Sequence, residues 1–223
     1  YVHENYQFKL VDDWIGVLTG QQEASFDWVA MQQSEKICRE NGVDFPYVEM
    51  EENENYSQSG QQIGILDMGG SSTEISFTPT LPGANIDENT YESVVYDSVT
   101  EHLYSTSYEG MGHNSAFENH QRLLIERAYS VGDLSNSYYD PCIPSGVSFY
   151  SKVRSPAGQQ ILLEGMGDPL NCDVIISGLL NITDSCSYDN CGLNETYQPF
   201  VENDPFIAFS QFGDIAAFFG LKG

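Results

Sequence analysis

Residues 65–77 read ILDMGGSSTEISF and carry the sharpest structural signal in the chain. Its apolar start predicts a buried strand over residues 63–67, and the alternation of residues 74–77 predicts a second strand. The two strands form a hairpin with a glycine-rich tip, because glycine tolerates the backbone conformations of a tight turn. The first strand then delivers the carboxylate of Asp67 to the edge of a sheet.

The tip of this hairpin combines groups that bind phosphate. Two glycines let the backbone approach an anion closely, and successive amides and hydroxyls can donate to phosphate oxygens or hold a water. Asp67 can reach a hydrated divalent cation that bridges the phosphates. The alternative is an ordinary Gly-Gly turn, but the ordered string D-x-G-G-S-S-T-E is much rarer. The candidate phosphate-binding residues are Gly69, Gly70, Ser71, Ser72 and Thr73.

Composition narrows the classes of ligand. The chain has 223 residues, enough for one sizeable core, and 33 Asp and Glu against 8 Lys and Arg give a formal charge of -25. Such an acidic surface repels the phosphate backbones of nucleic acids and anionic lipids. We therefore expect no nucleic-acid partner. No stretch approaches the roughly 20 apolar residues of a membrane span. An anionic ligand would need a local device: backbone amides, a helix N-terminus or a divalent cation.

The five cysteines indicate an oxidising compartment. Cys186 and Cys191 flank Ser-Tyr-Asp-Asn, which suits a tight turn closed by a disulfide. Two free or metal-binding thiols are the alternative, but a zinc site usually needs a second pair at similar spacing. Cys142 and Cys172 could form a second bridge, which leaves Cys38 free or paired outside this chain.

Three N-x-Ser/Thr sequons support the same compartment. They begin at Asn55, Asn181 and Asn194, and two of them flank the predicted Cys186–Cys191 loop. With the cysteines they predict a secreted or lumenal glycoprotein.

Three stretches predict helices. Residues 21–40 have a helix-compatible composition, with candidate inward positions Phe26, Val29, Ala30 and Ile37. Residues 115–130 carry the clearest amphipathic pattern, and its apolar face can use Phe117, Leu123, Leu124 and Ala128. The C-terminal apolar run 205–221 predicts a helix that starts at Pro205.

The remaining stretches predict strands and loops. Residues 14–18 and 160–163 predict strands, and residues 91–108 contain alternating strand-like stretches. Residues 49–62 and 78–90 predict loops, and residues 140–191 are rich in turns. No linker divides the chain.

The hairpin stretch resembles the second phosphate-binding loop of the apyrases, the ecto-nucleoside triphosphate diphosphohydrolases. Related exopolyphosphatases carry a similar loop, but further segments resemble apyrase motifs in one order along the chain. These are LTGQQEASFDW (18–28), HLYSTSYEGMGHNSAF (102–117), YDPCIPSG (139–146), GMGDPLNC (165–172), CSYDNC (186–191) and AFSQFGD (208–214). The resemblance implies an α/β fold: an RNase H-like lobe of the actin, Hsp70 and sugar-kinase superfamily, with a mixed sheet flanked by helices.

The resemblance also implies a mechanism, the metal-assisted attack of water on the terminal phosphate of a nucleoside di- or triphosphate. Glu23 would take the proton from that water, and Ser72 would orient it. Glu74 sits where apyrases usually place a Gln that helps, so the catalytic candidates are Glu23, Ser72 and Glu74. Asp67 would hold the water shell of a Mg²⁺ or Ca²⁺ ion.

The cysteine pattern follows the same resemblance. It implies the bridges Cys142–Cys172 and Cys186–Cys191. Another bridge of the family starts where this chain has Gly110, and both of its members are absent here, as the loss of a disulfide requires.

Several positions depart from the family pattern. Gln22 replaces the first Glu of a pair, Ala24 replaces a Gly, and Asp27 stands where a Gly is common. Near Gly213 the family often places a Tyr that stacks on the nucleobase. Trp28 keeps the motif, and we expect it to pack in the core rather than to contact a ligand.

Residues 1–223 are expected to form a single lobe that resembles the C-terminal lobe of an apyrase. The first phosphate loop, Asp-x-Gly-Ser-Ser on an N-terminal lobe, and a C-terminal return segment do not occur in this chain. This chain alone is therefore expected to be incomplete for catalysis, with a second chain or further residues supplying the other lobe. The competing hypothesis is a non-catalytic extracellular structural or assembly protein that retains the fold and self-assembles.

Overall fold

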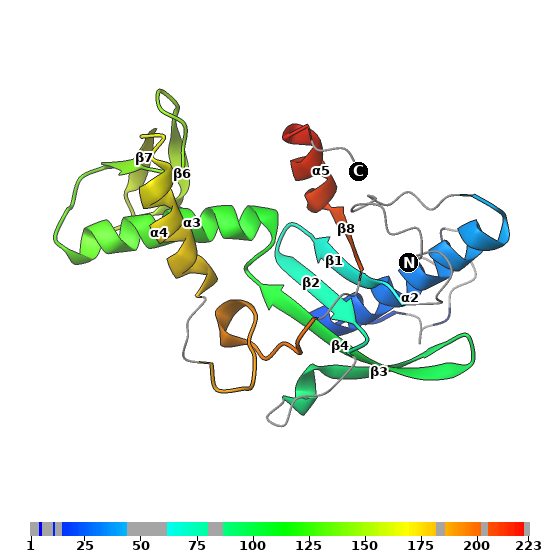
Figure 1. Cartoon of the computed structure of the whole chain (residues 1–223). Helices are drawn as coiled ribbons and strands as arrows, with labels where there is room; N and C mark the ends of the chain where they lie inside the picture. Colours follow the sequence, from blue (N-terminus) through cyan, green and yellow to red (C-terminus); the bar gives the residue numbers. More distant parts are fainter. Residues whose placement is uncertain are drawn as a thin grey trace.

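The computed structural model describes residues 15–43, 62–79, 87–181, 186–201 and 205–220, together with Asn5 and Val11. Its larger part is a five-stranded sheet in the order β3-β4-β2-β1-β8 (Figure 1). The strands are β1 (Gly64–Met68), β2 (Ser72–Phe77), β3 (Tyr91–Tyr96), β4 (Val99–Glu109) and β8 (Phe206–Ser210). The sheet is mixed, because β8 runs parallel to β1 while the other pairs are antiparallel.

The predicted hairpin is confirmed as β1 and β2. Asp67 lies opposite Glu74 in the register, and Met68 lies opposite Thr73. The amide of Gly69 donates to the carbonyl of Ser72 at 3.0 Å and closes the turn. Residues 69–71 are called the hairpin tip below.

Helix α2 (Gly20–Glu40) covers one face of the sheet. Trp28 on this helix is fully buried in a cluster with Ile65 and Leu103, which confirms that it packs in the core. Since side chains alternate along a strand, Asp67 and Glu74 belong to the same face as Ile65.

The opposite face carries the larger aromatic core. Ile75, Phe77, Tyr104, Tyr108 and Tyr197 are buried together there, and the Tyr104 hydroxyl donates to the carbonyl of Tyr197 at 2.5 Å. The long segment that contains Tyr197 and the short helix η4 (Leu193–Glu195) is thereby held against the sheet.

A smaller unit follows β4. It consists of a three-stranded sheet in the order β5-β7-β6, with helices α3 and α4 packed on each other beside it. Its elements are α3 (His113–Ser130), β5 (Ser137–Asp140), β6 (Ser148–Arg154), β7 (Gln160–Gly165) and α4 (Pro169–Leu180). Helix α3 runs from the edge of the larger sheet into this unit, where Ile125 packs with Tyr138 (Figure 1).

Both predicted disulfides are present. Cys142 in the turn after β5 is bonded to Cys172 in α4, with 4.7 Å between their Cα atoms. Cys186 is bonded to Cys191, while Cys38 in α2 is a free, half-buried thiol.

For the first two predicted helices, the prediction of which residues face the core was partly wrong. In α2, Phe26 and Ile37 are 52% and 49% exposed and Ala30 is exposed, whereas Val29 packs against the core as predicted. The buried face is instead formed by Ala24, Ser25, Trp28 and Gln32.

In α3 the apolar criterion also misplaces the buried face. Phe117 and Leu123 are 40% and 37% exposed, whereas Leu124 and Ala128 pack inward as predicted. Polar His120 and Gln121 take buried positions because they have partners: the Ser151 hydroxyl, for example, donates to Gln121 Oε1 at 2.7 Å. Buried hydrogen-bonded groups are invisible to a pattern of apolar residues.

Three further predictions differ from the structure. The described residues 15–18 form no strand, and Val17 is 97% exposed. The C-terminal run is not one helix but strand β8 followed by α5 (Gln211–Phe218), because pairing with β1 outweighs the local apolar pattern. The turn-rich region contains α4, whose start Asp168-Pro169 is an N-cap with proline in the first turn.

Some predictions fall outside the described residues: Trp14, Asn55 with its sequon, and most of the loops 49–62 and 78–90. Of the other two sequons, residues 194–196 and Asn181 are described: Asn194 is exposed, and the Asn181 side-chain amide donates to Asn194 Oδ1 at 3.3 Å. Within the described part of the chain, every helix is too short or too polar to cross a membrane.

The core under α2 predicts a difference between two identical substitutions. Leu103→Ala removes a fully buried side chain and should lower the free energy of unfolding by about 2–5 kcal/mol, because it leaves a cavity. Leu170→Ala removes a side chain that is 81% exposed and should change it by no more than about 0.5 kcal/mol. Urea denaturation measures both, and equal losses would contradict the core assignment.

Candidate phosphate-binding site

The hairpin tip is held by the first turn of α3. The amide of His113 donates to the carbonyl of Gly69 at 3.0 Å, and the amides of Asn114 and Ser115 donate to that of Gly70 at 2.9 and 3.1 Å. The next carbonyl, of Ser71, accepts from Gly110 and Gly112 at 3.0 and 3.1 Å. Three successive carbonyls of the loop are thus bound on one side.

This bonding fixes the direction of the loop amides. No described peptide bond is cis, so the N–H of each unit points away from its own carbonyl. Because the carbonyls of residues 69–71 point toward α3, the amides of Gly70, Ser71 and Ser72 point away from it. Within the described chain no carbonyl accepts from the amides of Gly70 and Ser71, and both residues are exposed. Successive outward amides are a typical anion-binding arrangement.

Gly112 allows α3 to approach the loop this closely. A Cβ at this position would lie 2.4 Å from the nitrogen of Ser72 and 2.5 Å from backbone atoms of Ser71. Only a residue without a side chain fits there. The sequence predicted no role for Gly112. The run Gly-Met-Gly before an amphipathic helix could have indicated this close approach.

Four carboxyl groups, Glu23, Asp27, Asp67 and Glu74, form an acidic cluster between α2 and the ends of β1 and β2. Asp67 and Glu74 are paired across the two strands, while Glu23 and Asp27 lie one turn apart on α2. The Ser107 hydroxyl of β4 donates to Glu74 Oε1 at 2.8 Å. The structure therefore brings together the predicted residues Glu23, Asp67, Ser72 and Glu74.

The cluster shifts the pKa of its buried members. Burial raises the pKa of Asp27 from 3.8 to about 6, with further increases from the charges of Asp67, Glu23 and Glu74. Burial also raises the pKa of Glu74, which is 1% exposed, while hydrogen bonds from Ser72 and Ser107 oppose this. Like charges at close range favour the uptake of a proton or a cation.

The acidic cluster fits a hydrated cation better than a directly bound ion. Asp67 Oδ1 is buried, and no hydrogen-bond donor in the described residues reaches it. Carboxylate oxygens are the ligands that Mg²⁺ and Ca²⁺ prefer. Among the described residues, however, no three members of this cluster form a group that could hold a metal ion directly. A cation here would be held largely through its own waters.

Two predicted phosphate ligands are already engaged. The Gly69 amide donates within the hairpin turn to Ser72, and the Thr73 hydroxyl donates to the carbonyl of Met111 at 2.9 Å. Thr73 points to the opposite face of the sheet, because its neighbour Glu74 faces α2. The loop amides available to an anion are therefore those of Gly70 and Ser71.

The departure at Gln22 has a structural explanation. Thr19 is the N-cap of α2: its hydroxyl accepts from the Gln22 amide at 3.2 Å, and its amide donates to Gln22 Oε1 at 3.0 Å. This capping box accepts Gln as well as Glu at its last position. Residue 22 therefore supports the helix that carries Glu23.

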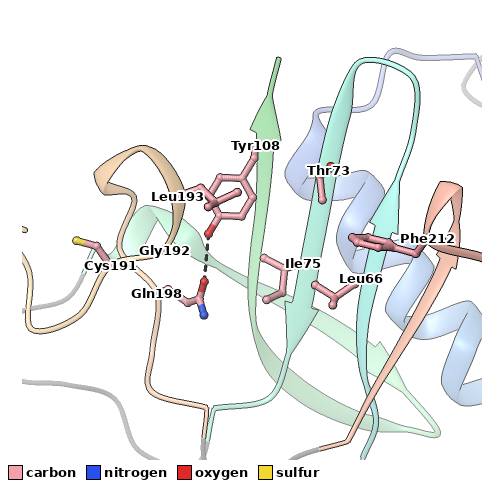
Figure 2. A pocket seen from close by; sticks show the side chains of 9 residues that line it. All are labelled: Leu66, Thr73, Ile75, Tyr108, Cys191, Gly192, Leu193, Gln198 and Phe212. Carbon is pink, nitrogen blue, oxygen red and sulfur yellow. Dashed lines mark hydrogen bonds between the residues drawn. The ribbon is translucent and has the colours of Figure 1, made fainter. Parts of the chain in front are cut away.

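An apolar pocket of about 310 Å³ lies on the other face of the sheet (Figure 2). It is lined by Leu66, Thr73, Ile75, Tyr108, Cys191, Gly192, Leu193, Gln198 and Phe212, none of which carries a charge. Within this lining, the Tyr108 hydroxyl donates to Gln198 Oε1 at 3.2 Å. The sheet separates this pocket from the acidic cluster.

A mixed sheet flanked by helices, with an acidic cluster beside the hairpin tip, defines the class of the structure as an α/β lobe. The sequence matches the GDA1/CD39 (nucleoside phosphatase) family over residues 1–223, and the chain belongs to this family. The predicted apyrase relationship is confirmed.

Individual relatives agree with this assignment. The chain is 29% identical over 214 residues to ectonucleoside triphosphate diphosphohydrolase 8 of Rattus norvegicus, covering 91% of this chain and 40% of that protein. It is 27% identical to ectonucleoside triphosphate diphosphohydrolase 2 of Homo sapiens (88% and 38% covered) and 23% identical to probable apyrase 5 of Arabidopsis thaliana (96% and 42%). The chain thus spans about 40% of the length of these relatives.

A solved structure confirms the fold. The crystal structure of nucleoside triphosphate hydrolases from Neospora caninum superposes with a TM-score of 0.59 at 14% identity, covering 98% of this chain and 49% of that one. The chain is an α/β lobe of the RNase H-like, actin-like ATPase type, as the sequence predicted.

The tight contact at Gly112 predicts a specific loss of stability. Gly112→Ala should lower the free energy of unfolding by about 1–3 kcal/mol, because backbone atoms of the hairpin tip must move. Gly178→Ala is the matched control: its Cβ would meet nothing within 4 Å, and alanine favours the helix by up to about 1 kcal/mol. Thermal unfolding compares the two, and an unaffected Gly112→Ala variant would refute the contact.

The acidic cluster predicts a pH dependence. Since the pKa of Asp27 is raised in the folded state, that state binds more protons than the unfolded one between about pH 4 and 6. The unfolding free energy should therefore fall as pH rises through this window. Asp27→Asn removes this decrease in the unfolding free energy, because Asn does not ionise. The variant should therefore be more stable than wild type at pH 7, and the difference should be smaller at pH 4. Urea denaturation at both pH values measures this; a difference independent of pH would contradict the raised pKa.

Proposed function

We propose that this chain is the phosphate-binding lobe of a nucleoside tri- and diphosphate hydrolase, with residues 1–223 forming one lobe of a larger two-lobed enzyme. The observation that carries the proposal is the juxtaposition of outward loop amides and an acidic cluster around one hairpin. The amides offer donors to an anion, and the carboxylates offer a base and sites for a cation. Membership of the nucleoside phosphatase family supports this reading.

Each nearby group has a proposed role in the hydrolysis. Glu23 is exposed on the first turn of α2 and takes the proton from the attacking water. Ser72, hydrogen-bonded to Glu74, orients that water. The amides of Gly70 and Ser71 hold the terminal phosphate oxygens and stabilise the charge that builds up on them.

Asp67 is the proposed holder of the cation, Ca²⁺ or Mg²⁺, through its water shell. Its buried, unpartnered oxygen supports this role. Held there by Asp67, such an ion would supply charge neutralisation and polarisation at the phosphate. The ion would also reduce the repulsion between the nucleotide and the chain, because a nucleotide would otherwise meet four carboxyl groups and a formal charge of -25.

The rest of the site is proposed to come from a second lobe. The relatives are more than twice as long as this chain, so a further segment or a second chain would supply the first phosphate loop. Two disulfides and the exposed sequon at Asn194 support a secreted or lumenal setting. In this chain α5 has Gly213 near the position where a base-stacking Tyr is common, which favours recognition of the phosphates over recognition of the base.

A hydrolysis assay on the natively purified protein tests the proposal. Phosphate release from ATP and ADP should require Ca²⁺ or Mg²⁺ and stop with EDTA, and Glu23→Gln should lower kcat by about 10²–10⁴-fold. Glu40→Gln, an exposed acid at the other end of α2, should leave kcat unchanged. Absence of release from natively assembled protein would instead support the non-catalytic structural role.

A further inference from the structure

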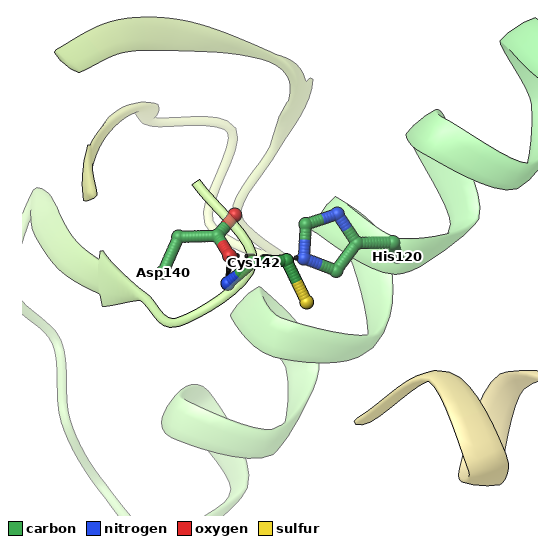
Figure 3. A group of neighbouring side chains, drawn as sticks. All are labelled: His120, Asp140 and Cys142. Atoms are coloured by element: carbon green, nitrogen blue, oxygen red, sulfur yellow. Dashed lines mark hydrogen bonds and ion pairs between the residues drawn. The ribbon is translucent and has the colours of Figure 1, made fainter. Parts of the chain in front are cut away.

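A second group of ligand-type side chains lies in the smaller unit, away from the hairpin tip. Figure 3 shows His120 of α3, Asp140 at the end of β5 and Cys142 in the following turn. His120 is 4% exposed and Asp140 is fully buried. His120 Nε2 lies 3.1 Å from Asp140 Oδ1, and the Cys142 amide donates to the same oxygen at 2.9 Å.

The second carboxylate oxygen of Asp140 indicates that a ligand could bind here. Asp140 Oδ2 is buried and has no hydrogen-bond partner among the described residues. A buried carboxylate oxygen without a hydrogen-bond partner lowers the stability of the fold, because its lost hydration is not replaced. Such an atom in a native structure often has a ligand or another function. One nitrogen, one oxygen and one sulfur of His120, Asp140 and Cys142 all lie within 4.8 Å of one another.

In the oxidised chain the sulfur cannot act as a thiolate ligand, because Cys142 is bonded to Cys172. We propose that reduction of this disulfide turns His120, Asp140 and Cys142 into a binding site for a borderline-soft divalent cation such as Zn²⁺. Imidazole, carboxylate and thiolate are the ligands that zinc selects, and three of them leave a fourth position for water. Ca²⁺ and Mg²⁺ prefer all-oxygen sites and do not fit this set.

The reduction is an ordinary thiol–disulfide exchange. A thiolate of a dithiol reductant attacks one sulfur, forms a mixed disulfide and expels the other cysteine as a thiolate. The second thiol of the reductant then attacks the mixed disulfide. Cys142 and Cys172 end as two thiols and the reductant as a disulfide, a transfer of two electrons. Both cysteines are half-buried rather than enclosed, so a reductant can reach them.

Metal binding then needs only a small adjustment. Zinc–ligand bonds of about 2.0–2.3 Å place neighbouring ligand atoms roughly 3.3–3.8 Å apart. The nitrogen and oxygen are already 3.1 Å apart, and the Cys142 sulfur becomes free to rotate toward them once it leaves Cys172. The thiol proton is released to solvent as the thiolate binds, with no further redox change.

Two matched variants test the site, both made with Cys38→Ser to remove the free thiol. Cys172→Ser and Cys142→Ser each lack the bridge, but only Cys172→Ser keeps the Cys142 thiol. In competition with a chromophoric chelator, Cys172→Ser should bind one Zn²⁺ per chain on the order of 100-fold more tightly than Cys142→Ser does. Co²⁺ in place of zinc should give a thiolate charge-transfer band in this variant alone.

The controls separate this site from other thiols. Asp140→Asn in the Cys172→Ser chain should weaken zinc binding by about 10-fold or more. Equal affinities of the two cysteine variants, or no effect of Asp140→Asn, would overturn the proposal. If either variant fails to fold by circular dichroism, native mass spectrometry of the wild-type chain decides. One zinc gained on reduction and lost again in Asp140→Asn supports the site, and no such gain overturns it.

Discussion

The site depends on the hydrogen bonds between the first turn of α3 and the carbonyls of the hairpin tip. The first amides of a helix have no partners within the helix, and here the loop carbonyls satisfy them. The same bonds place the positive end of the helix behind the loop and turn the loop amides outward. Gly112 makes the contact possible, since any side chain there would strike the loop backbone. One set of bonds therefore caps the helix and turns the amides of Gly70 and Ser71 outward.

The electrostatics of the chain explain why such local devices are needed. A formal charge of -25 disfavours every anionic ligand, and the four carboxyl groups near the tip make the local potential more negative still. In the proposed site, the outward amides and a cation near Asp67 would reverse this sign over a few ångströms. The raised pKa values of Asp27 and Glu74 are the cost of placing these acids between a helix and a sheet.

Local chemistry predicted the hairpin well, because strand, turn and strand are contiguous in residues 63–77. The strand end also pointed to Asp67, whereas Glu23 and Glu74 came only from the resemblance to apyrases, and the structure places these three side chains near one another. Local chemistry could not find the direction of the loop amides, since that depends on α3, some forty residues later in the chain. Partnered polar residues such as Gln121 misled the apolar pattern of α3, and strand β8 owes its form to a distant pairing with β1. Each failure has a long-range cause.

Helix α3 also has a mechanical consequence. Its 18 residues form a rod about 27 Å long, anchored at one end to the hairpin tip and at the other in the smaller unit. A rod of that length that tilts by about 5° moves its far end by roughly 2 Å. Any shift of the smaller unit is therefore felt at the tip as a change in the angle of the helix. The smaller unit therefore has the geometry of a lever arm that ends at the hairpin tip.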